Sequence, residues 1–322
     1  MRHCDYRLFL LFDDDRVIGR IAVFINPAAN EHWGEKIGFF GHYECIDDEE
    51  AAIMLLESGA KWLREQGMET MRGQWNLVSQ DIGFVYEGFD LPPVVLSSYN
   101  LPYYNDQVAA FGMKKAKDLV VYNCDISKGY KIPDRFLRLT DRIARRYGVT
   151  VRQIDMKNLV EDARIMLRLS NESLANNWGY YPVEEAEAEE IAADLKMIVH
   201  PEVVLIAEID GKPIGYVITV PDVNHILKDM NGRLFPFGIF KLLRGVKRLN
   251  RYRIWAMGIL PQYQRKGISV SMFRRLNDIL APKESYIEVN YVLEDNDLMN
   301  NAIIKLGFDL VKRYRIYETP LA

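Results

Sequence analysis

An internal repeat constrains this chain more strongly than any other feature of its sequence. Residues 7–26 and 203–220 each contain two runs of β-branched and aromatic residues separated by an acidic turn, which is the pattern of a β-hairpin. Residues 109–122 and 305–318 each join the end of a helical pattern to a strand-like run through a glycine, a residue that often ends helices. The members of each pair lie about 196 positions apart. The repeat therefore predicts two units of similar topology.

Strands and helices alternate between these landmarks. Apolar residues recur at every second position where we predict a strand, and at every third or fourth position where we predict a helix. The first half is predicted to contain a strand at 36–46, a helix at 48–66 and a strand at 68–76; the second half, a strand at 252–260, a helix at 270–280 and a strand at 286–293. Hairpins combined with helix-linked strands place the fold in the mixed α/β class.

The two halves are unequal in length. A strand at 149–154 and two helices, at about 160–175 and 183–197, are predicted before the second hairpin, whereas the first hairpin begins at residue 7. Residues 125–148 contain a short basic helix, 134–146, and have the composition of a linker. The expected organisation is a shortened, degenerate unit at 1–125, a linker with a basic helix at 126–148 and a complete unit at 149–322.

The composition excludes several classes of protein. The 322 residues are 49% hydrophobic and 27% charged, so the chain has the apolar surface that a disordered protein lacks. A net charge of −4 gives no overall basic field that would attract nucleic acid. The three cysteines and five histidines have no disulfide or metal-ligand spacing, so we expect no metal. The sequence has no recognisable signal peptide or membrane-spanning run, which favours a cytoplasmic location.

The clearest chemical signal follows the predicted strand 252–260. A polar stretch, QRKGIS at 264–269, leads into an amphipathic helix. Backbone N–H groups at the start of a helix bind anions such as phosphate, and Gly267 permits the close backbone approach that this requires. Glycines also begin helices that bind nothing, so the spacing alone leaves a purely structural role open.

The first half differs at the corresponding position. Four acidic residues, 47–50, stand there at the start of the predicted helix. Carboxylates suit the positive end of a helix dipole but repel a pyrophosphate. We therefore expect the first unit to be a structural or substrate-shaping partner without a phosphate site.

The segment ILPQYQRKGISVSMFRRL resembles motif A of the GNAT (GCN5-related N-acetyltransferase) superfamily, whose pattern is Q/R-x-x-G-x-G/A. Gln264, Gly267 and Ser269 occupy its three defined positions, although Ser269 replaces the usual glycine or alanine. The later segment YVLEDNDLMNNAIIKLGF resembles motif B, with Asn296 at the usual asparagine position. The chain is thus similar to tandem GNAT proteins of the bacterial kind, with a full domain at 149–322 and a partial one at 6–125.

The resemblance implies two GNAT-like units, each with a mostly antiparallel twisted sheet flanked by helices. It also implies an N-acyltransferase that moves an acetyl or other acyl group from acyl-CoA to an amine, in the C-terminal unit. A backbone N–H near Ile259 would polarise the thioester carbonyl. The residues implied to bind acetyl-CoA or another acyl-CoA are Ile259, Gln264, Arg265, Lys266, Gly267, Ile268, Ser269 and Asn296.

Direct attack on a thioester requires an unprotonated amine, so a base must assist. Glu294 is the predicted base because it follows the fifth strand of the unit, where the sheet of this fold opens. Two structural alternatives stay open, namely that Glu294 caps the next helix or pairs with a lysine. The tyrosine that usually reprotonates the thiolate is replaced by Ile303, and Tyr291, Tyr314 and Tyr317 are the other phenols nearby in the sequence.

The predicted acceptor-facing residues are Trp178, Tyr180, Tyr181, Asn224 and Tyr291. The aromatic cluster 176–182 stands between two predicted helices, where GNAT proteins shape the acceptor pocket, although some of these rings would instead fill the core. Asn224 is expected to end a strand, and it could either bind the acceptor or form a turn.

Residues 237–253 contain six Lys and Arg residues and no acid, with apolar residues at helical spacing. A solvated helix packed on the sheet is the favoured interpretation. The alternatives are a basic rim that receives phosphates or an acidic acyl-carrier protein, and contact with an anionic membrane. We expect neither nucleic acid nor membrane contact.

The expected function is thus acyl-CoA-dependent N-acylation of a small-molecule or peptide amine. One alternative is transfer from acyl-carrier protein, including transfer of a long acyl chain. Another is a non-catalytic acyl-CoA-binding or scaffold protein, which Ile303 and Ser269 keep open.

Overall fold

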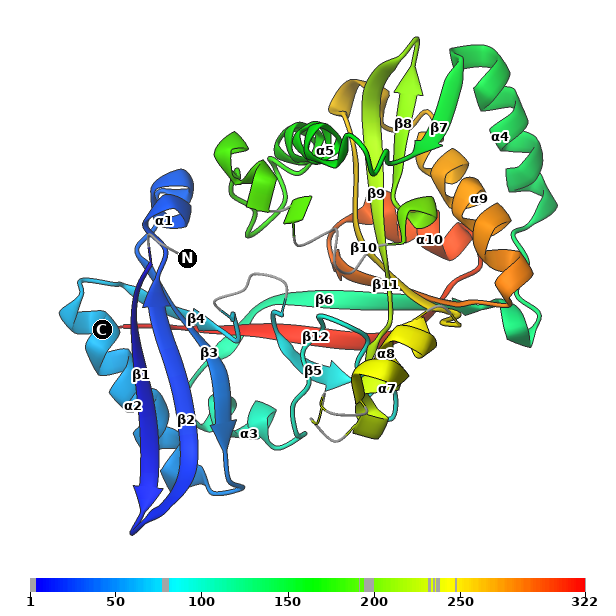
Figure 1. Cartoon of the computed structure of the whole chain (residues 1–322). Coiled ribbons are helices and arrows are strands. Elements are labelled where there is room, and N and C mark those ends of the chain that lie inside the picture. The colour runs from blue at the N-terminus through cyan, green and yellow to red at the C-terminus, as the bar shows by residue number, and fades with distance from the viewer. Residues whose placement is uncertain are drawn as a thin grey trace. The chain divides into compact units, whose positions relative to one another are not determined.

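The structure is a computed structural model that describes residues 4–76, 81–190, 192–193, 200–230, 233, 235, 238–246 and 248–321 (Figure 1). Parts of two predicted segments, the helix 183–197 and the basic stretch 237–253, lie outside these residues. Contacts divide the chain into two compact units. The first contains Met1–Val120 and Val311–Ala322, and the second contains Val121–Leu310. The C-terminal residues thus pack with the first unit, and the predicted GNAT-like ranges 1–125 and 149–322 with their linker at 126–148 stay predictions.

The first unit is built on five strands in the order β1-β2-β3-β4-β12, with β5 also paired to β12. Strands β3 and β4 are parallel, whereas β1–β2, β2–β3, β4–β12 and β5–β12 are antiparallel. Its elements are β1 (Asp5–Asp13), β2 (Arg16–Ile25), α1 (Pro27–Trp33), β3 (Ile37–Cys45), α2 (Glu49–Glu65), β4 (Thr70–Gly73), β5 (Phe84–Glu87) and α3 (Tyr104–Ala110), together with parts of β6 (Lys114–Asp125) and β12 (Asp309–Pro320).

The core of the first unit forms where the hydrophobic periodicity predicts it. Helix α2 begins after Asp48, whose side chain accepts a hydrogen bond from the amide of Ala51. The buried residues of α2 recur at helical spacing and pack against those of β2 and β3. The outward face of edge strand β1 carries four side chains that are more than half exposed, namely Tyr6, Leu8, Leu10 and Phe12.

The second unit repeats this arrangement with more elements. Its strands have the order β6-β11-β10-β9-β8-β7. Strands β10 and β11 are parallel, whereas β7–β8, β8–β9 and β9–β10 are antiparallel. Its elements are α4 (Asp134–Tyr147), β7 (Val149–Gln153), α5 (Leu159–Ser173), β8 (Leu205–Ile209), β9 (Lys212–Pro221), α7 (Asn224–Leu227), α8 (Gly238–Val246), β10 (Arg251–Ile259), α9 (Ile268–Leu280), β11 (Tyr286–Leu293) and α10 (Asp297–Lys305). Short 3-10 turns occur at Ile126–Lys128, Glu185–Glu187, Pro201–Val203, Lys228–Met230, Pro261–Tyr263 and Ala281–Lys283.

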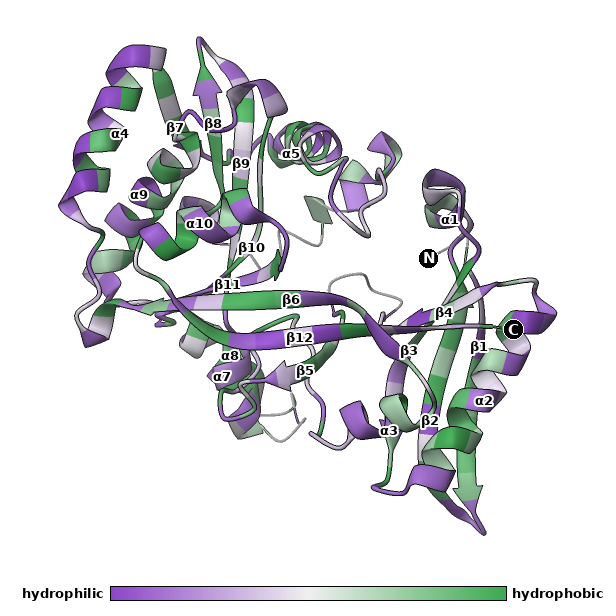
Figure 2. Ribbon diagram, turned by 180° about the vertical axis from the view of Figure 1, so that it is seen from behind, coloured by the Kyte–Doolittle hydropathy of each residue, from purple (hydrophilic) through white to green (hydrophobic). Residues whose placement is uncertain are grey.

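Helices α5 and α9 cover opposite faces of the second sheet (Figure 1), and α4 packs on α9. The sheet strands are rich in hydrophobic residues, whereas α4 is mostly hydrophilic (Figure 2). The predicted mixed α/β class, with mostly antiparallel sheets flanked by helices, is confirmed. Within the described ranges, none of the helices has the length and apolar character that crossing a bilayer requires.

The prediction of one basic helix over 237–253 is wrong. Helix α8 ends at Val246, and strand β10 begins at Arg251. Arg253 is only 1% exposed, because it lies within β10 and opposite Glu288 of β11. The tertiary pairing of this strand outweighs the local helical pattern.

Candidate functional site

Strands β10 and β11 part halfway along their length. Their parallel ladder begins at Arg251–Tyr286 and stops at Ile254–Val289. Beyond this point β10 continues beside β9 as far as Ile259, after a shift in register. A strand that loses one neighbour presents backbone N–H and C=O groups along that edge. The second unit therefore has an opening in its ladder where an extended ligand could form backbone hydrogen bonds.

The predicted phosphate loop stands directly after this opening. The side-chain amide of Gln264 donates a hydrogen bond of 3.0 Å to the backbone oxygen of Ile259, which fastens the loop to the end of β10. Arg265 and Gly267 adopt left-handed φ angles of 59° and 79°, and Gly267 is the N-cap of α9. Ile268 is buried, so only its backbone can face a ligand, while Ser269 is half-buried in the first turn. This geometry places the first amides of α9 at a turn suited to an anion.

Helix α4 forms one wall of this loop. A Cβ atom built on Gly267 would lie 2.6 Å from Cδ1 of Ile143. The ammonium of Lys266 lies 5.0 Å from the ring centre of Tyr263 and 5.9 Å from that of Tyr147. The helix predicted as part of a linker thus packs against the candidate anion site in the second unit.

The residues after β11 divide into a cap and a candidate base. Oδ1 of Asn296 accepts a hydrogen bond of 3.1 Å from the amide of Met299, so Asn296 is the N-cap of α10. The alternative that Glu294 caps this helix is therefore wrong. Glu294 lies one residue beyond β11 and is half-buried, and its backbone oxygen accepts a hydrogen bond from Asn300.

Only one of the three phenols near motif B lies in the second unit. Tyr314 and Tyr317 belong to the first unit, where their hydroxyls donate to Ser98 and Asn105. Tyr291 is a half-buried residue of β11, just beyond the last β10–β11 pair. Ile303, at the position of the usual acid, is fully buried in α10.

A buried polar cluster lies at the point where the strands part. Arg253, Glu288 and Asn290 are each 1% exposed. The carboxylate of Glu288 accepts hydrogen bonds from Asn290 (2.8 Å) and from the hydroxyl of Tyr286 (3.2 Å). Burial and the nearby Glu288 carboxylate raise the pKa of Tyr286 to about 12. Among the described residues, Oδ1 of Asn290 has no hydrogen-bond partner.

Sequence reasoning identified neither Glu288 nor Arg253 as a site residue. A signal for both existed, because charged residues at 251, 253 and 288 interrupt otherwise apolar strands, and buried charges need compensating partners. The guanidinium of Arg253 also lies 5.2 Å from the ring centre of Tyr291.

The predicted acceptor residues occupy three regions, namely the loop after α5, the start of α7 and, for Tyr291, strand β11. Trp178, Tyr180 and Tyr181 are half-buried in the loop after α5. The hydroxyl of Tyr180 donates a hydrogen bond of 2.6 Å to Asn171, and burial raises its pKa. Asn224 does not end a strand as predicted, because β9 ends at Pro221 and Asn224 begins α7.

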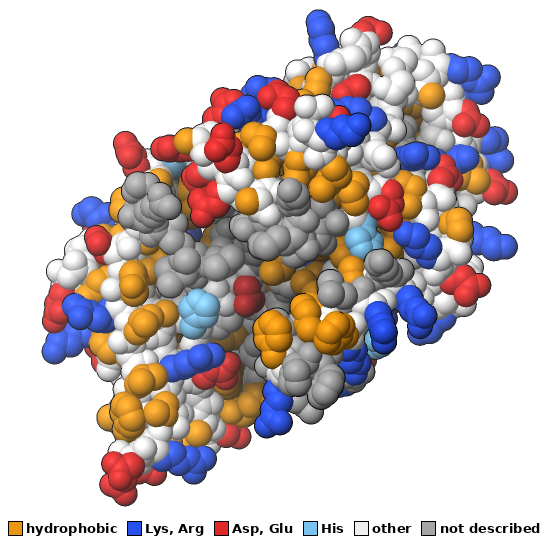
Figure 3. Space-filling model, viewed as in Figure 1, with side chains coloured by type: hydrophobic (Ala, Val, Ile, Leu, Met, Phe, Trp, Pro, Cys, Tyr) orange, Lys and Arg blue, Asp and Glu red, His pale blue; other side chains and the backbone are white. Residues whose placement is uncertain are grey.

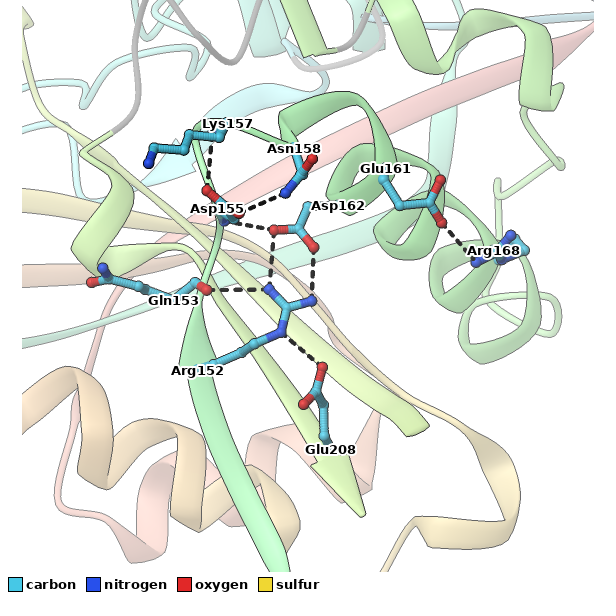
Figure 4. A network of polar contacts seen from close by, with 9 residues as sticks. All are labelled: Arg152, Gln153, Asp155, Lys157, Asn158, Glu161, Asp162, Arg168 and Glu208. Atoms are coloured by element: carbon cyan, nitrogen blue, oxygen red, sulfur yellow. Dashed lines mark hydrogen bonds and ion pairs between the residues drawn. The ribbon is translucent and has the colours of Figure 1, made fainter. Parts of the chain in front are cut away.

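A charged network positions α5 and hence the loop that follows it (Figure 4). The guanidinium of Arg152 donates two hydrogen bonds to Asp162, of 2.7 and 3.0 Å, and one of 2.7 Å to Glu208. Asp162 also accepts from the amide of Asp155. The network joins β7, β8 and the first turn of α5, and sequence reasoning did not find it because its members are far apart in the chain.

Comparisons with known proteins bear on this site. Residues 165–308 match the family model described as "Acetyltransferase (GNAT) family". The chain is 31% identical over 317 residues to Protein YghO of Escherichia coli (strain K12), covering 95% of this chain and 80% of that protein. It is 32% identical over 330 residues to Bacterial ceramide synthase of Caulobacter vibrioides (strain NA1000 / CB15N), covering 99% and 85%.

Solved structures are similar in fold. A tandem GNAT protein from the clavulanic acid biosynthesis pathway matches with a TM-score of 0.56 and 12% identity, over 99% of this chain and 84% of that one. A GCN5-related N-acetyltransferase from Sphaerobacter thermophilus matches with a TM-score of 0.55 and 11% identity, over 96% and 78%. Within the described residues, no three His, Cys, Asp or Glu side chains are grouped as metal ligands.

Proposed function

Because this chain belongs to the acetyltransferase (GNAT) family, we propose that its second unit transfers an acyl group from acyl-CoA to an amine. The observation that carries the proposal is the parting of β10 and β11 directly before the Gly267 loop. The gap between the two strands is suited to an extended pantetheine chain, and the Gly267 loop is suited to a pyrophosphate.

The donor would bind mainly through backbone groups. The edge of β10 up to Ile259 would hold the pantetheine, and one of its N–H groups would stabilise the charge that develops on the thioester oxygen. The amides of 267–269 would hold the pyrophosphate. Arg265 and Lys266 are exposed beside them and add positive charge.

The chemistry needs one proton acceptor and one proton donor. The amine nitrogen forms a bond to the thioester carbon, the C–S bond breaks, and the amine loses a proton that Glu294 would accept directly or through water. The departing thiolate gains a proton, for which Tyr291 is the candidate donor. Both residues lie on the β11 side of the opening.

We propose a long-chain lipid amine as the acceptor class. One relative is named a ceramide synthase, and a ceramide is the amide of a fatty acid and a long-chain amino alcohol. The half-buried rings of Trp178, Tyr180 and Tyr181 provide apolar surface, and Asn290 with Glu288 provides buried polar groups for an amino alcohol. The donor would accordingly be a long-chain acyl-CoA, with acetyl-CoA as the shorter alternative, and the place of action the cytoplasm.

Turnover assays would test this proposal. The full chain would be incubated with acetyl-CoA or palmitoyl-CoA, and with either sphinganine or a water-soluble amine such as a lysine peptide. Release of the CoA thiol and the mass of the amide product would be measured. We expect palmitoyl transfer to sphinganine.

Each alternative has a distinct outcome. Turnover with acyl-carrier protein but not with acyl-CoA would identify the carrier as donor. Acyl-CoA binding without turnover of either amine would support a non-catalytic role. No binding of CoA by calorimetry would contradict the assignment of the site.

A further inference from the structure

The segment between β9 and β10 has an unusual surface. Three large apolar side chains stand out from it, because Phe235 is 75% exposed, Phe240 is 60% exposed and Leu227 is 41% exposed. Monomeric proteins rarely gather such residues without a partner. Figure 3 shows hydrophobic and basic side chains next to one another over α7 and α8.

The packing of α8 explains why Phe240 points outward. A Cβ atom built on Gly245 would lie 2.7 Å from Cδ1 of Ile226, so the Gly245 side of α8 rests on α7. Phe240 precedes Gly245 by five residues, which places it about 140° away around the helix at 100° per residue. Burial of Phe240 against α7 is therefore excluded while this contact is made.

The charged residues of this segment are mostly basic, since residues 222–250 contain six Lys and Arg residues and two acids, Asp222 and Asp229. Lys228, Arg233, Lys241, Arg244 and Arg248 are exposed in the same segment. From residue 237 to the start of β10 the sequence contains no acidic residue. Exposed aromatic and aliphatic residues among cations are the composition of elements that lie in the interface of an anionic bilayer.

Although the sequence led us to expect no membrane contact, we propose that this surface, formed by Leu227, Phe235 and Phe240 with the surrounding Lys and Arg residues, docks the protein on anionic lipid membranes. The inference rests on the proposed function, since a long-chain amine is found in a bilayer rather than in water. An acidic carrier protein would be attracted by the same cations but gives no reason for three exposed apolar side chains. An anionic lipid surface accounts for both the cations and the exposed apolar side chains.

Vesicle co-sedimentation of the full chain tests the proposal. The vesicles would be phosphatidylcholine with and without phosphatidylglycerol, and no acyl-CoA or acceptor would be present. We expect binding to the anionic vesicles only, weakened by salt. The triple variant Leu227→Ser, Phe235→Ser, Phe240→Ser should bind about tenfold or more weakly, because it loses the apolar side chains that would insert into the bilayer. The charge variant Arg244→Glu should also bind less.

The matched control is Leu8→Ser with Leu10→Ser on β1, which removes comparably exposed apolar side chains from the first unit. It should keep wild-type vesicle binding, and all variants should keep wild-type CoA binding and thermal unfolding. The proposal is overturned if wild type ignores anionic vesicles, if the triple variant binds as wild type, or if purified acyl-carrier protein is captured through Arg244 while vesicles are not. Loss of CoA binding by wild type would instead count against the proposed function.

Discussion

At the scale of single residues, Ser269 is a sharper probe of the anion site than Gly267. Any side chain at Gly267 would displace Ile143 of α4 and would strain a left-handed backbone, so loss of binding there would not be specific. Ser269 is half-buried in the first turn of α9, where an ordinary helical backbone accepts any side chain without the strain expected at Gly267.

We expect Ser269→Asp to lower CoA affinity at least tenfold, because a carboxylate would stand where a pyrophosphate must bind. The same change should leave the unfolding temperature unchanged or slightly higher, since acids suit the first turn of a helix. Calorimetry with CoA and a thermal melt measure the two effects. The control Ser269→Ala, which has the family's usual small residue, should bind as wild type. Equal binding by the aspartate variant would remove the pyrophosphate from this loop.

A second prediction at this scale concerns Glu294. Glu294→Gln should lower turnover by about 100-fold at neutral pH while sparing acyl-CoA binding, because the amide retains the shape but cannot accept the proton. The loss should shrink at high pH, where more of the amine, with a pKa of ~10, is already unprotonated. A pH–rate profile for the first active amine would measure this. A variant profile that overlays the wild-type profile would assign the base elsewhere, with buried Glu288 the next candidate.

Only some of the candidate site residues could be predicted from the sequence. Gly267 could be found from the helix-start pattern, and Gln264 and Asn296 from the resemblance to the GNAT motifs. Gly267 and Asn296 are the N-caps of α9 and α10. Arg253 and Asn290 could not, because strand pairing, rather than local sequence, buries them together at the end of the β10–β11 ladder.

At the scale of elements, the Arg152 network should stabilise the docking of α5. Asp162→Ala is expected to cost about 2 kcal/mol of unfolding free energy, because it leaves the guanidinium and the Asp155 amide without their acceptor. Urea unfolding at pH 7 measures this. The neighbouring Glu161→Ala is the control and should change stability by less than about 0.5 kcal/mol, since its ion pairs are exposed. Equal losses of unfolding free energy for the two variants would contradict a stabilising role of the Arg152 network.

The pairing of β6 with β12 in the first unit should be pH-dependent. Burial acts to raise the pKa of Asp118, but hydrogen bonds from Arg315 and Lys115 outweigh it and hold the pKa below its ordinary value. Because the folded-state pKa is the lower one, this stabilisation is present above the unfolded value of ~3.9 and is lost as the pH falls through the folded value.

Urea unfolding of wild type and Asp118→Asn therefore has a definite expected pattern. The variant should be less stable at pH 7, and the difference should shrink below about pH 4 as the wild-type carboxylate becomes protonated. The exposed Asp13→Asn is the control and should match wild type at both pH values. A difference that is constant with pH would contradict the ion-pair explanation.

Most helices and strands could be predicted because the spacing of hydrophobic residues indicates which face of an element is buried, as in α2, α9 and the two hairpins. The short helix α1 and strand β5 were not, because they have too few residues to establish a period. The packing of residues 311–322 with the first unit was also not predictable, since a strand's sequence does not specify which sheet it joins.

At the scale of the whole molecule, the repeat raises the question of whether each unit binds a donor. Both units contain a hairpin followed by two parallel strands that are joined by a helix. Strands β3 and β4 of the first unit correspond to β10 and β11 of the second. In the first unit, however, the strands do not separate after their ladder. The amide of Trp75 donates to the oxygen of Phe40 at 2.7 Å, and the amide of His42 donates to the side chain of Asn76 at 2.6 Å.

The N-terminus of α2 is also occupied by side chains of the first unit. Asp48 accepts a hydrogen bond from the amide of Ala51 at this N-terminus, and Glu49 and Glu50 follow in the first turn. In the second unit the corresponding cap is Gly267, which has no side chain, and the first turn of α9 contains no acid. The positions that correspond to the strand opening and the candidate anion site are therefore both filled by the chain itself in the first unit.

We therefore expect one molecule of acyl-CoA to bind per chain. Titration calorimetry of the full chain with a non-hydrolysable acyl-CoA should give a stoichiometry near one, and Ser269→Asp should abolish that signal rather than halve it. As the reciprocal change, replacing Asp48, Glu49 and Glu50 with Gly, Ala and Ala removes the acids, but Trp75 and Asn76 would still bridge the strands. This triple variant should still bind a single equivalent. Two equivalents of similar affinity in wild type would mean that the strands of the first unit part on binding, and that the repeat extends to function.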